Sequence, residues 1–312
     1  MPVGVRYSQP TRRVYLVRGA KTLAFLALTG VLVAVTTAWW MGGQLYASAN
    51  HPVGPPPADL PAQPVAFPSA SGAVLKGWLV PSFSQHAGVV LMHGSGGDRR
   101  SMISRARFLR AAGYPVLLFD FQTTGESLGQ HTTDGYLEAR DAQAAVAFMR
   151  AAGGVKKVGI IGFSLGGAAT VLGEHPLAAE AVVLEAVYTT IEAATAARIE
   201  LRLGPYSGWL YRLFTWQLGP RLGIHPEQLR PIETIGAIQA PVFLIAGTKD
   251  PHPTLAESQR LFAAAPAPKQ FWAVAGAAHE NFHAHNPQGY EARVLDFFAR
   301  TLLGEPTGAQ EP

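Results

Sequence analysis

The chain has 312 residues, of which 48% are hydrophobic and 15% charged, so it can bury a large core and is not intrinsically disordered. Its formal net charge is +4, but residues 1–21 hold five of the 25 basic side chains and no acidic one. The rest of the chain is nearly neutral, which argues against a nucleic-acid partner. Cysteine is absent, which excludes disulfides and a thiol nucleophile.

An uncharged apolar segment predicts one transmembrane helix over residues 22–41. A helix of this length spans roughly 30 Å of hydrocarbon. Trp39 and Trp40 stand at its far end, and the basic cluster in 1–21 precedes it, so we expect a cytoplasmic N-terminus and a body outside the cytoplasm. A retained signal anchor is our first expectation. The alternatives are a signal peptide cleaved near Ala49 and a twin-arginine signal around Arg12 and Arg13.

Residues 42–70 include seven prolines between Pro52 and Pro68. Such a composition is typical of an extended polyproline linker, which would hold the body away from a bilayer. We therefore expect the folded domain over residues 71–304 and a flexible tail over residues 305–312.

Short apolar runs alternate with helix-like stretches throughout the predicted domain, and this alternation indicates an α/β fold with a mostly parallel sheet covered on both faces. The predicted strands are 73–80, 89–92, 116–119, 158–161, 181–184, 242–245 and 271–274, and the predicted helices are 99–112, 136–152, 165–174, 254–265 and 290–303.

One interval breaks the alternation. Residues 189–236 separate two predicted strands and contain Trp209, Tyr211, Phe214 and Trp216. A structureless loop of this size is disfavoured, so we expect an inserted helical cap. Its aromatic rings would pack the cap on the body or line a pocket for an acyl group.

Ligands of such sheets bind at the carboxyl ends of the strands, and three motifs fall there. Gly162-Phe-Ser164-Leu-Gly166 matches the G-x-S-x-G nucleophile elbow between a strand and a helix, which makes Ser164 a candidate nucleophile. Asp250 follows a predicted strand where an orienting acid would lie, although an aspartate before proline is also typical of turns. His279 follows the last predicted strand, where an imidazole could act as the base.

A glycine-rich loop, His93-Gly-Ser-Gly-Gly97, ends another predicted strand. Its backbone amides could turn toward the elbow, so we expect the amides of Ser95 and Leu165 to form the oxyanion hole. A dinucleotide-binding loop is the rival interpretation, but the third glycine of that pattern is replaced by Arg99.

These motifs occur in the order found in the α/β-hydrolase superfamily, and from about Ala73 to Leu303 the chain resembles it. The chain looks most like the membrane-anchored serine hydrolases of the BEM46-like and prolyl-oligopeptidase-like type. The resemblance implies that Ser164 is the nucleophile, Asp250 the orienting acid and His279 the base. The chain departs from the family pattern D-x-R-G-x-G-x-S, because residues 120–127 read D-F-Q-T-T-G-E-S.

Residues 279–283 also match H-E-x-x-H, the signature of zinc peptidases. That chemistry needs both histidines on one helical face, whereas here the motif begins at a turn and Pro287 limits any helix. We expect His283 and His285 to be surface residues, and Asp134, Glu138 and Asp141 to be solvated near a helix start. Glu185 ends a strand and could support the site.

The sequence therefore predicts a membrane-tethered serine hydrolase of esters or related acyl compounds, with no metal or organic cofactor. Its partners would be a small acyl substrate and the membrane. Peptidase, thioesterase and acyltransferase activities remain alternatives because the same triad serves them all. A zinc peptidase and a non-catalytic binding module are the other two hypotheses.

Overall fold

The computed structural model describes residues 12–82, 86–152 and 154–304. The chain divides into two units, Met1–Gln44 and Leu45–Pro312. The first eleven residues of the predicted basic segment 1–21 and the predicted tail 305–312 lie outside the described residues.

A single long helix, α1 (Arg12–Leu45), dominates the first unit. Within it, Tyr15–Leu45 is long and apolar enough to cross a membrane, with a mean hydropathy of 1.9. The helix begins before and ends after the predicted span 22–41. Basic residues are good helix formers and can extend their charges toward the headgroup region, so Arg18 and Lys21 do not end it.

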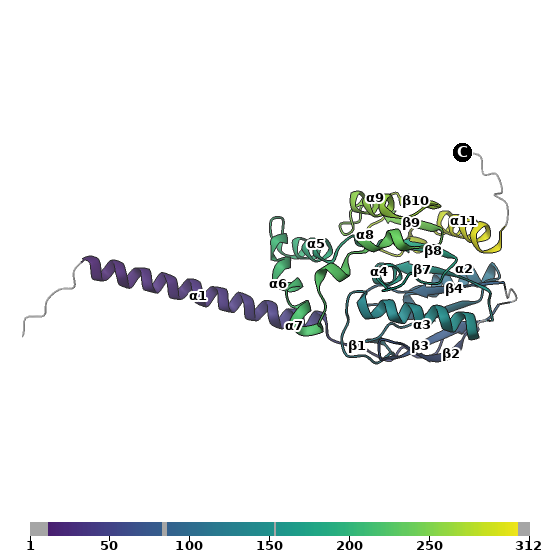
Figure 1. Ribbon diagram of the computed structural model, residues 1–312, viewed down its shortest axis with the longest axis horizontal. Coiled ribbons are helices and arrows are strands. Elements are labelled where there is room, and N and C mark those ends of the chain that lie inside the picture. The colour runs from purple at the N-terminus through teal and green to yellow at the C-terminus, as the bar shows by residue number, and fades with distance from the viewer. Residues whose placement is uncertain (1–11, 83–85, 153, 305–312) are drawn as a thin grey trace, which may run out of the picture. The chain divides into compact units, whose positions relative to one another are not determined.

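The second unit is built on an eight-stranded sheet with the strand order β10-β9-β8-β7-β4-β5-β3-β2 (Figure 1). The adjacent pairs β10-β9, β9-β8, β8-β7, β7-β4 and β4-β5 are parallel, while β3 is antiparallel to both β2 and β5. The predicted, mostly parallel α/β-hydrolase sheet is confirmed. The strands are β2 (Gln63–Pro68), β3 (Val74–Val80), β4 (Ala87–Met92), β5 (Val116–Phe119), β7 (Lys157–Phe163), β8 (Ala181–Glu185), β9 (Val242–Gly247) and β10 (Lys269–Val274).

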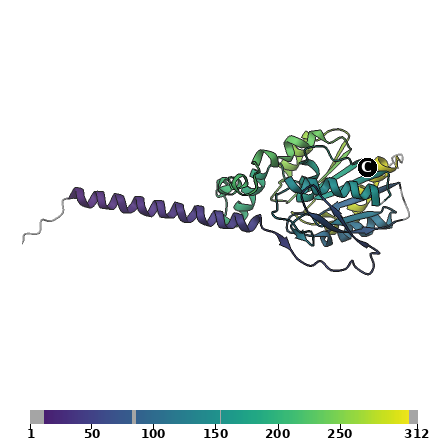
Figure 2. The same cartoon turned by 60° about the horizontal axis from the view of Figure 1, so that its bottom comes forward.

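Helices cover both faces of this sheet, and alternate residues of each strand supply the two cores (Figure 1 and Figure 2). Leu91 and Leu118 belong to a core with α2 and α11, whereas their neighbours Val90 and Leu117 belong to a core with α3. The strands therefore read as continuous apolar runs because both faces are buried. The covering helices are α2 (Ile103–Ala111), α3 (Tyr136–Ala152), α4 (Leu165–Val171), α9 (Leu255–Ala264) and α11 (Pro287–Phe298).

The predicted linker 42–70 is largely part of the folded domain, which corrects the expected domain start at residue 71. Strand β1 (Ala49–Asn50) pairs with β6 (Thr124–Gly125), and β2 forms an edge of the main sheet. Pro64 and Pro68 fit there, because the outer side of an edge strand needs no ladder donor. The dark blue trace along the lower edge of the domain in Figure 2 is this segment. It contributes Val53, Leu60 and Phe67 to the buried core.

Short helices fill the interval between β8 and β9, the expected cap. Trp209 is 66% exposed there, so this ring neither packs the cap on the body nor lines an enclosed pocket. The helical segments are α5 (Ile191–Leu203), η2 (Gly208–Leu210), α6 (Tyr211–Thr215), α7 (Leu218–Leu222), η3 (Pro226–Leu229), α8 (Pro231–Thr234) and η4 (Ile235–Ala237).

Two acidic residues of α3 are buried, so the expectation that they are solvated was wrong. Glu138 accepts hydrogen bonds from the backbone amides of Thr133 and Gly135, at 3.0 and 2.9 Å. Asp141 accepts from the hydroxyl of Ser69 and from the amide of Gln122, at 2.6 and 2.9 Å. Both buried carboxylates therefore have hydrogen-bond donors from neighbouring segments of the fold.

Candidate active site

Ser164 lies at a sharp turn between β7 and α4, in the backbone geometry of a nucleophile elbow. Its φ and ψ are 51° and −108°, a conformation that a residue with a side chain rarely adopts. A Cβ on Gly162 would lie 2.7 Å from the backbone of Gly166, so the turn closes only with glycine at that position. The amide of Ser164 donates to the carbonyl of Glu185 at 2.8 Å, which anchors the elbow to β8.

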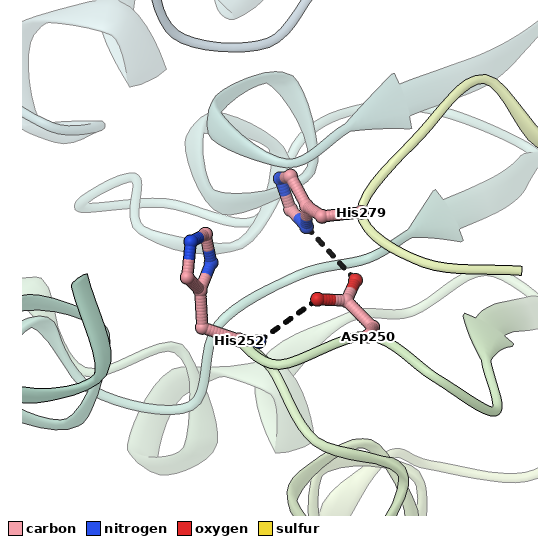
Figure 3. A group of neighbouring side chains, drawn as sticks. All are labelled: Asp250, His252 and His279. Carbon is pink, nitrogen blue, oxygen red and sulfur yellow. Dashed lines mark hydrogen bonds and ion pairs between the residues drawn. The ribbon is translucent and has the colours of Figure 1, made fainter. Parts of the chain in front are cut away.

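Three predicted residues come together at the carboxyl ends of the strands. His279 Nε2 lies 3.1 Å from Ser164 Oγ, and His279 Nδ1 lies 2.8 Å from Asp250 Oδ2. The Asp250 side chain is 1% exposed and that of His279 is 22% exposed. Figure 3 shows the carboxylate of Asp250 directed at the ring of His279. His279 is 115 positions from Ser164 and 29 positions from Asp250 along the chain, so the fold alone brings the three together.

The contacts assign a direction to each hydrogen bond. An ionised carboxylate only accepts, so His279 donates its Nδ1–H to Asp250, and the lone pair of Nε2 faces the serine hydroxyl. The distance of 3.1 Å is within the reach of a general base. The arrangement can therefore remove the proton of Ser164 while Asp250 holds the ring in one tautomer.

The glycine-rich loop 93–97 lies against the elbow. A Cβ on Gly94 would meet the ring of Phe163 at 2.8 Å and the Cβ of Ser164 at 3.4 Å. Leu165 is the first residue of α4, so its amide has no acceptor within the helix. The oxyanion role of the Ser95 and Leu165 amides stays a prediction.

His93 holds this loop in place. Its ring is fully buried, its Nδ1 donates to the carbonyl of Gly94 at 2.8 Å, and its Nε2 accepts from the amide of Phe121 at 3.2 Å. Burial lowers the pKa of His93, which favours the neutral ring that this pair of bonds requires.

The loop after β5 accommodates the departures from the family pattern. Thr123 stands where the pattern has its first glycine and adopts a φ of 65°. Gln122 replaces the arginine of the pattern, but Arg99 supplies a guanidinium to Asp120 at 2.5 Å. The amides of Arg99 and Glu126 also donate to this carboxylate, at 2.8 and 2.9 Å. Burial nevertheless raises the pKa of Asp120 above its usual range.

Glu185 lies behind the elbow in a buried ionic cluster. Arg105 donates to it through Nη2 at 2.5 Å and through Nε at 3.1 Å, and the hydroxyl of Tyr290 also donates to the carboxylate. All three side chains are almost completely buried. The sequence indicated a supporting role for Glu185 but gave no sign of its partners, which come from α2 and α11.

The H-E-x-x-H segment does not form the helix that a zinc peptidase requires. His279 lies in a turn, and α10 (Phe282–His285) begins only afterwards. His283 is buried and pairs with Glu291 at 2.7 Å, which corrects its expected surface position, while the exposed His285 pairs with Glu280 at 3.1 Å. The two histidines of the motif therefore serve separate contacts.

Sequence reasoning missed one residue beside the triad. His252 donates its backbone amide to Asp250 Oδ1 at 2.9 Å, and its ring centroid lies 4.9 Å from that of His279 (Figure 3). Burial and the neighbouring His279 lower the pKa of His252. Its place in the turn Asp250-Pro-His252-Pro, two residues after the acid, was the only available sequence signal.

Comparison with known proteins agrees with this fold. The alpha/beta hydrolase family model matches residues 89–293, and the chain belongs to that family. The structure of the Pyrococcus furiosus esterase Pf2001 is similar, with a TM-score of 0.67 and 26% identity, over 82% of this chain and 99% of that one. Family membership and this likeness define the chain as a hydrolase; the BEM46-like branch stays a prediction.

Two curated relatives extend the similarity along most of the chain. An uncharacterized protein of Mycobacterium tuberculosis is 29% identical over 296 residues, which cover 92% of this chain and 96% of the relative. The protein YqkD of Bacillus subtilis, also uncharacterized, is 23% identical over 243 residues, which cover 74% and 77% of the two chains.

Proposed function

We propose that the protein is a serine hydrolase that cleaves a carboxylic ester or a related acyl compound through an acyl-enzyme. Ser164 is the nucleophile, His279 the base and Asp250 the orienting acid. The observation that supports this best is the continuous chain of contacts from Ser164 Oγ to His279 at 3.1 Å and from His279 to Asp250 at 2.8 Å.

In the first half of the reaction, His279 Nε2 takes the proton of Ser164 as Oγ attacks the carbonyl carbon. The amides of Ser95 and Leu165 stabilise the oxyanion of the tetrahedral intermediate. His279 then gives its proton to the leaving oxygen, and the bond to the alcohol breaks. In the second half, His279 takes a proton from water, the hydroxide attacks the acyl-enzyme, and the acid leaves as Ser164 regains its proton.

An ester is our first choice of substrate because of the likeness to the Pf2001 esterase. Peptidase, thioesterase and acyltransferase activities use the same three groups and differ in the leaving group or acceptor. A non-catalytic binding module would have no need for the aligned serine, imidazole and carboxylate.

A substrate panel tests the proposal and separates these alternatives. We expect p-nitrophenyl esters of graded acyl-chain length to be hydrolysed, and His279→Ala to abolish hydrolysis. Aminoacyl amides and acyl thioesters in the same panel report peptidase and thioesterase activity. A folded protein that cleaves none of these compounds would contradict the proposal.

We also propose that α1 tethers the domain to the outer face of the cytoplasmic membrane. The basic residues before the apolar span support this orientation. Retention is favoured over cleavage near Ala49, because the amide of Ala49 donates to the carbonyl of Thr123 at 2.8 Å as part of the folded domain. Mass spectrometry of the mature N-terminus and protease accessibility in intact cells test retention and side; a chain beginning near Asn50 would refute retention.

A further inference from the structure

His252 takes no part in the reaction, yet its ring lies beside the catalytic imidazole. The two ring centroids are 4.9 Å apart, and the ring planes are inclined by 51°. The His252 side chain is half-buried, and among the described residues its ring nitrogens have no hydrogen-bond partner. The backbone amide of His252 donates to Asp250 Oδ1 at 2.9 Å, which keeps this residue beside the carboxylate.

Asp250, His252 and His279 together form a set of metal ligands. One carboxylate oxygen and one nitrogen from each ring lie within 4.8 Å of one another (Figure 3). Two imidazoles and one carboxylate, with a fourth position left for water, are a ligand set that suits Zn²⁺. Bonds of about 2.0–2.1 Å in tetrahedral geometry require ligand atoms roughly 3.3 Å apart. Asp250 Oδ2 and His279 Nδ1 already lie 2.8 Å apart, so the ring of His252 is the ligand that has to move closer.

We propose that a transition-metal dication, with Zn²⁺ as the type case, binds reversibly to Asp250, His252 and His279 and switches the hydrolase off. The ion is an inhibitor and not a cofactor. The binding itself depends only on these three side chains, whereas the inhibition rests on the proposed function of Ser164 and His279.

Coordination disables the base through either ring nitrogen of His279. If the metal binds Nε2, the lone pair that faces Ser164 is occupied and cannot accept the hydroxyl proton. If the metal binds Nδ1 in place of the hydrogen bond to Asp250, the single proton of the neutral ring moves to Nε2, which then has no lone pair for the serine. In both cases Ser164 keeps its proton and remains a weak nucleophile.

The proposal predicts selectivity among metals. Mg²⁺ and Ca²⁺ prefer oxygen ligands, so they would bind this set poorly. The other histidine and acid pairs near the site, His283 with Glu291 and His285 with Glu280, are separate two-residue contacts. His285 is exposed, so His285→Ala provides a matched control for loss of a neighbouring imidazole.

The first experiment measures binding without activity. Full-length protein in detergent, stripped with a chelator and carrying Ser164→Ala, is titrated with ZnCl₂ by calorimetry. We expect one Zn²⁺ per chain, at least tenfold weaker binding when His252→Ala is added, and no change when His285→Ala is added. Equal binding with and without His252, or no zinc binding by the folded protein, would overturn the proposal.

The second experiment measures inhibition of ester hydrolysis in protein with an intact Ser164. We expect Zn²⁺ to inhibit and a chelator to restore activity, whereas Mg²⁺ has no effect. His252→Ala should retain activity and raise the inhibitory zinc concentration at least tenfold, with His252→Gln as a second variant if the alanine variant does not fold. Undiminished inhibition of these variants would refute the proposal. Zinc binding that depends on His252 in a protein that hydrolyses no acyl compound would instead refute the proposed function.

Discussion

The buried cluster behind the elbow allows a quantitative prediction for Arg105→Met. The substitution removes both donors of Arg105, which lie 2.5 and 3.1 Å from Glu185, and leaves a fully buried carboxylate with the hydroxyl of Tyr290 as its remaining side-chain partner. Breaking a buried ion pair from one side costs about 3–5 kcal/mol, because the other charge stays desolvated. At roughly 2–4 °C per kcal/mol for a domain of this size, the midpoint of thermal unfolding should fall by about 6–20 °C.

Arg107→Met on the same helix is the matched control. Arg107 pairs with Asp59 at 2.6 Å, but these side chains are 49% and 59% exposed, and such surface pairs contribute about 0–1 kcal/mol. Thermal unfolding of the full-length protein in detergent, followed by circular dichroism, compares the variants. Adding Glu185→Met to Arg105→Met should restore much of the loss, because no unpaired charge remains. If Arg105→Met shifted the midpoint no more than Arg107→Met, the reasoning about this cluster would be wrong.

Three further predictions follow. Gly162→Ala should abolish ester hydrolysis, because its Cβ would lie 2.7 Å from the backbone of Gly166, whereas Gly219→Ala, with open space at its Cβ, should leave hydrolysis unchanged. Asp250→Asn should lower kcat by about 10⁴-fold through the wrong imidazole tautomer while the fold persists, and an unchanged kcat would contradict its role. Burial raises the pKa of Glu138 to about 7, so the folded chain binds more protons than the unfolded chain between about pH 4.5 and 7. Stability should therefore fall by up to roughly 3 kcal/mol as pH rises through that window, and unfolding of Glu138→Gln should show a flatter pH dependence.

The sequence predicted the sheet well, and it also placed Ser164, Asp250 and His279 at one edge of that sheet, because both expectations depend on local patterns. Continuous apolar runs identify strands buried on both faces, and in a parallel sheet the residues that follow such runs gather at one edge. Ser164 directly follows β7, whereas Asp250 comes shortly after β9 ends at Gly247 and His279 shortly after β10 ends at Val274. Knowledge of the strands was therefore enough to bring the three residues together.

The remaining features depend on contacts that no local pattern encodes. Residues 63–68 contain two prolines and suggested a linker, but an edge strand tolerates proline, and β3 supplies the partner. Glu138 and Asp141 suggested a solvated helix start, yet Glu138 accepts from the amide of Thr133 in the preceding turn, and Asp141 accepts from the hydroxyl of Ser69, 72 positions away along the chain. The position of His252 beside His279 likewise depends on how two loops meet.

Covalent labelling tests the central claim most directly. The full-length protein is treated with a fluorophosphonate probe, and the labelled peptide is identified by mass spectrometry for wild type, Ser164→Ala and the exposed-serine control Ser48→Ala. We expect one adduct on Ser164 in wild type and in Ser48→Ala, and no labelling of Ser164→Ala. Labelling of a different residue, or a folded wild-type protein that takes no label, would contradict the assignment of Ser164 as the nucleophile.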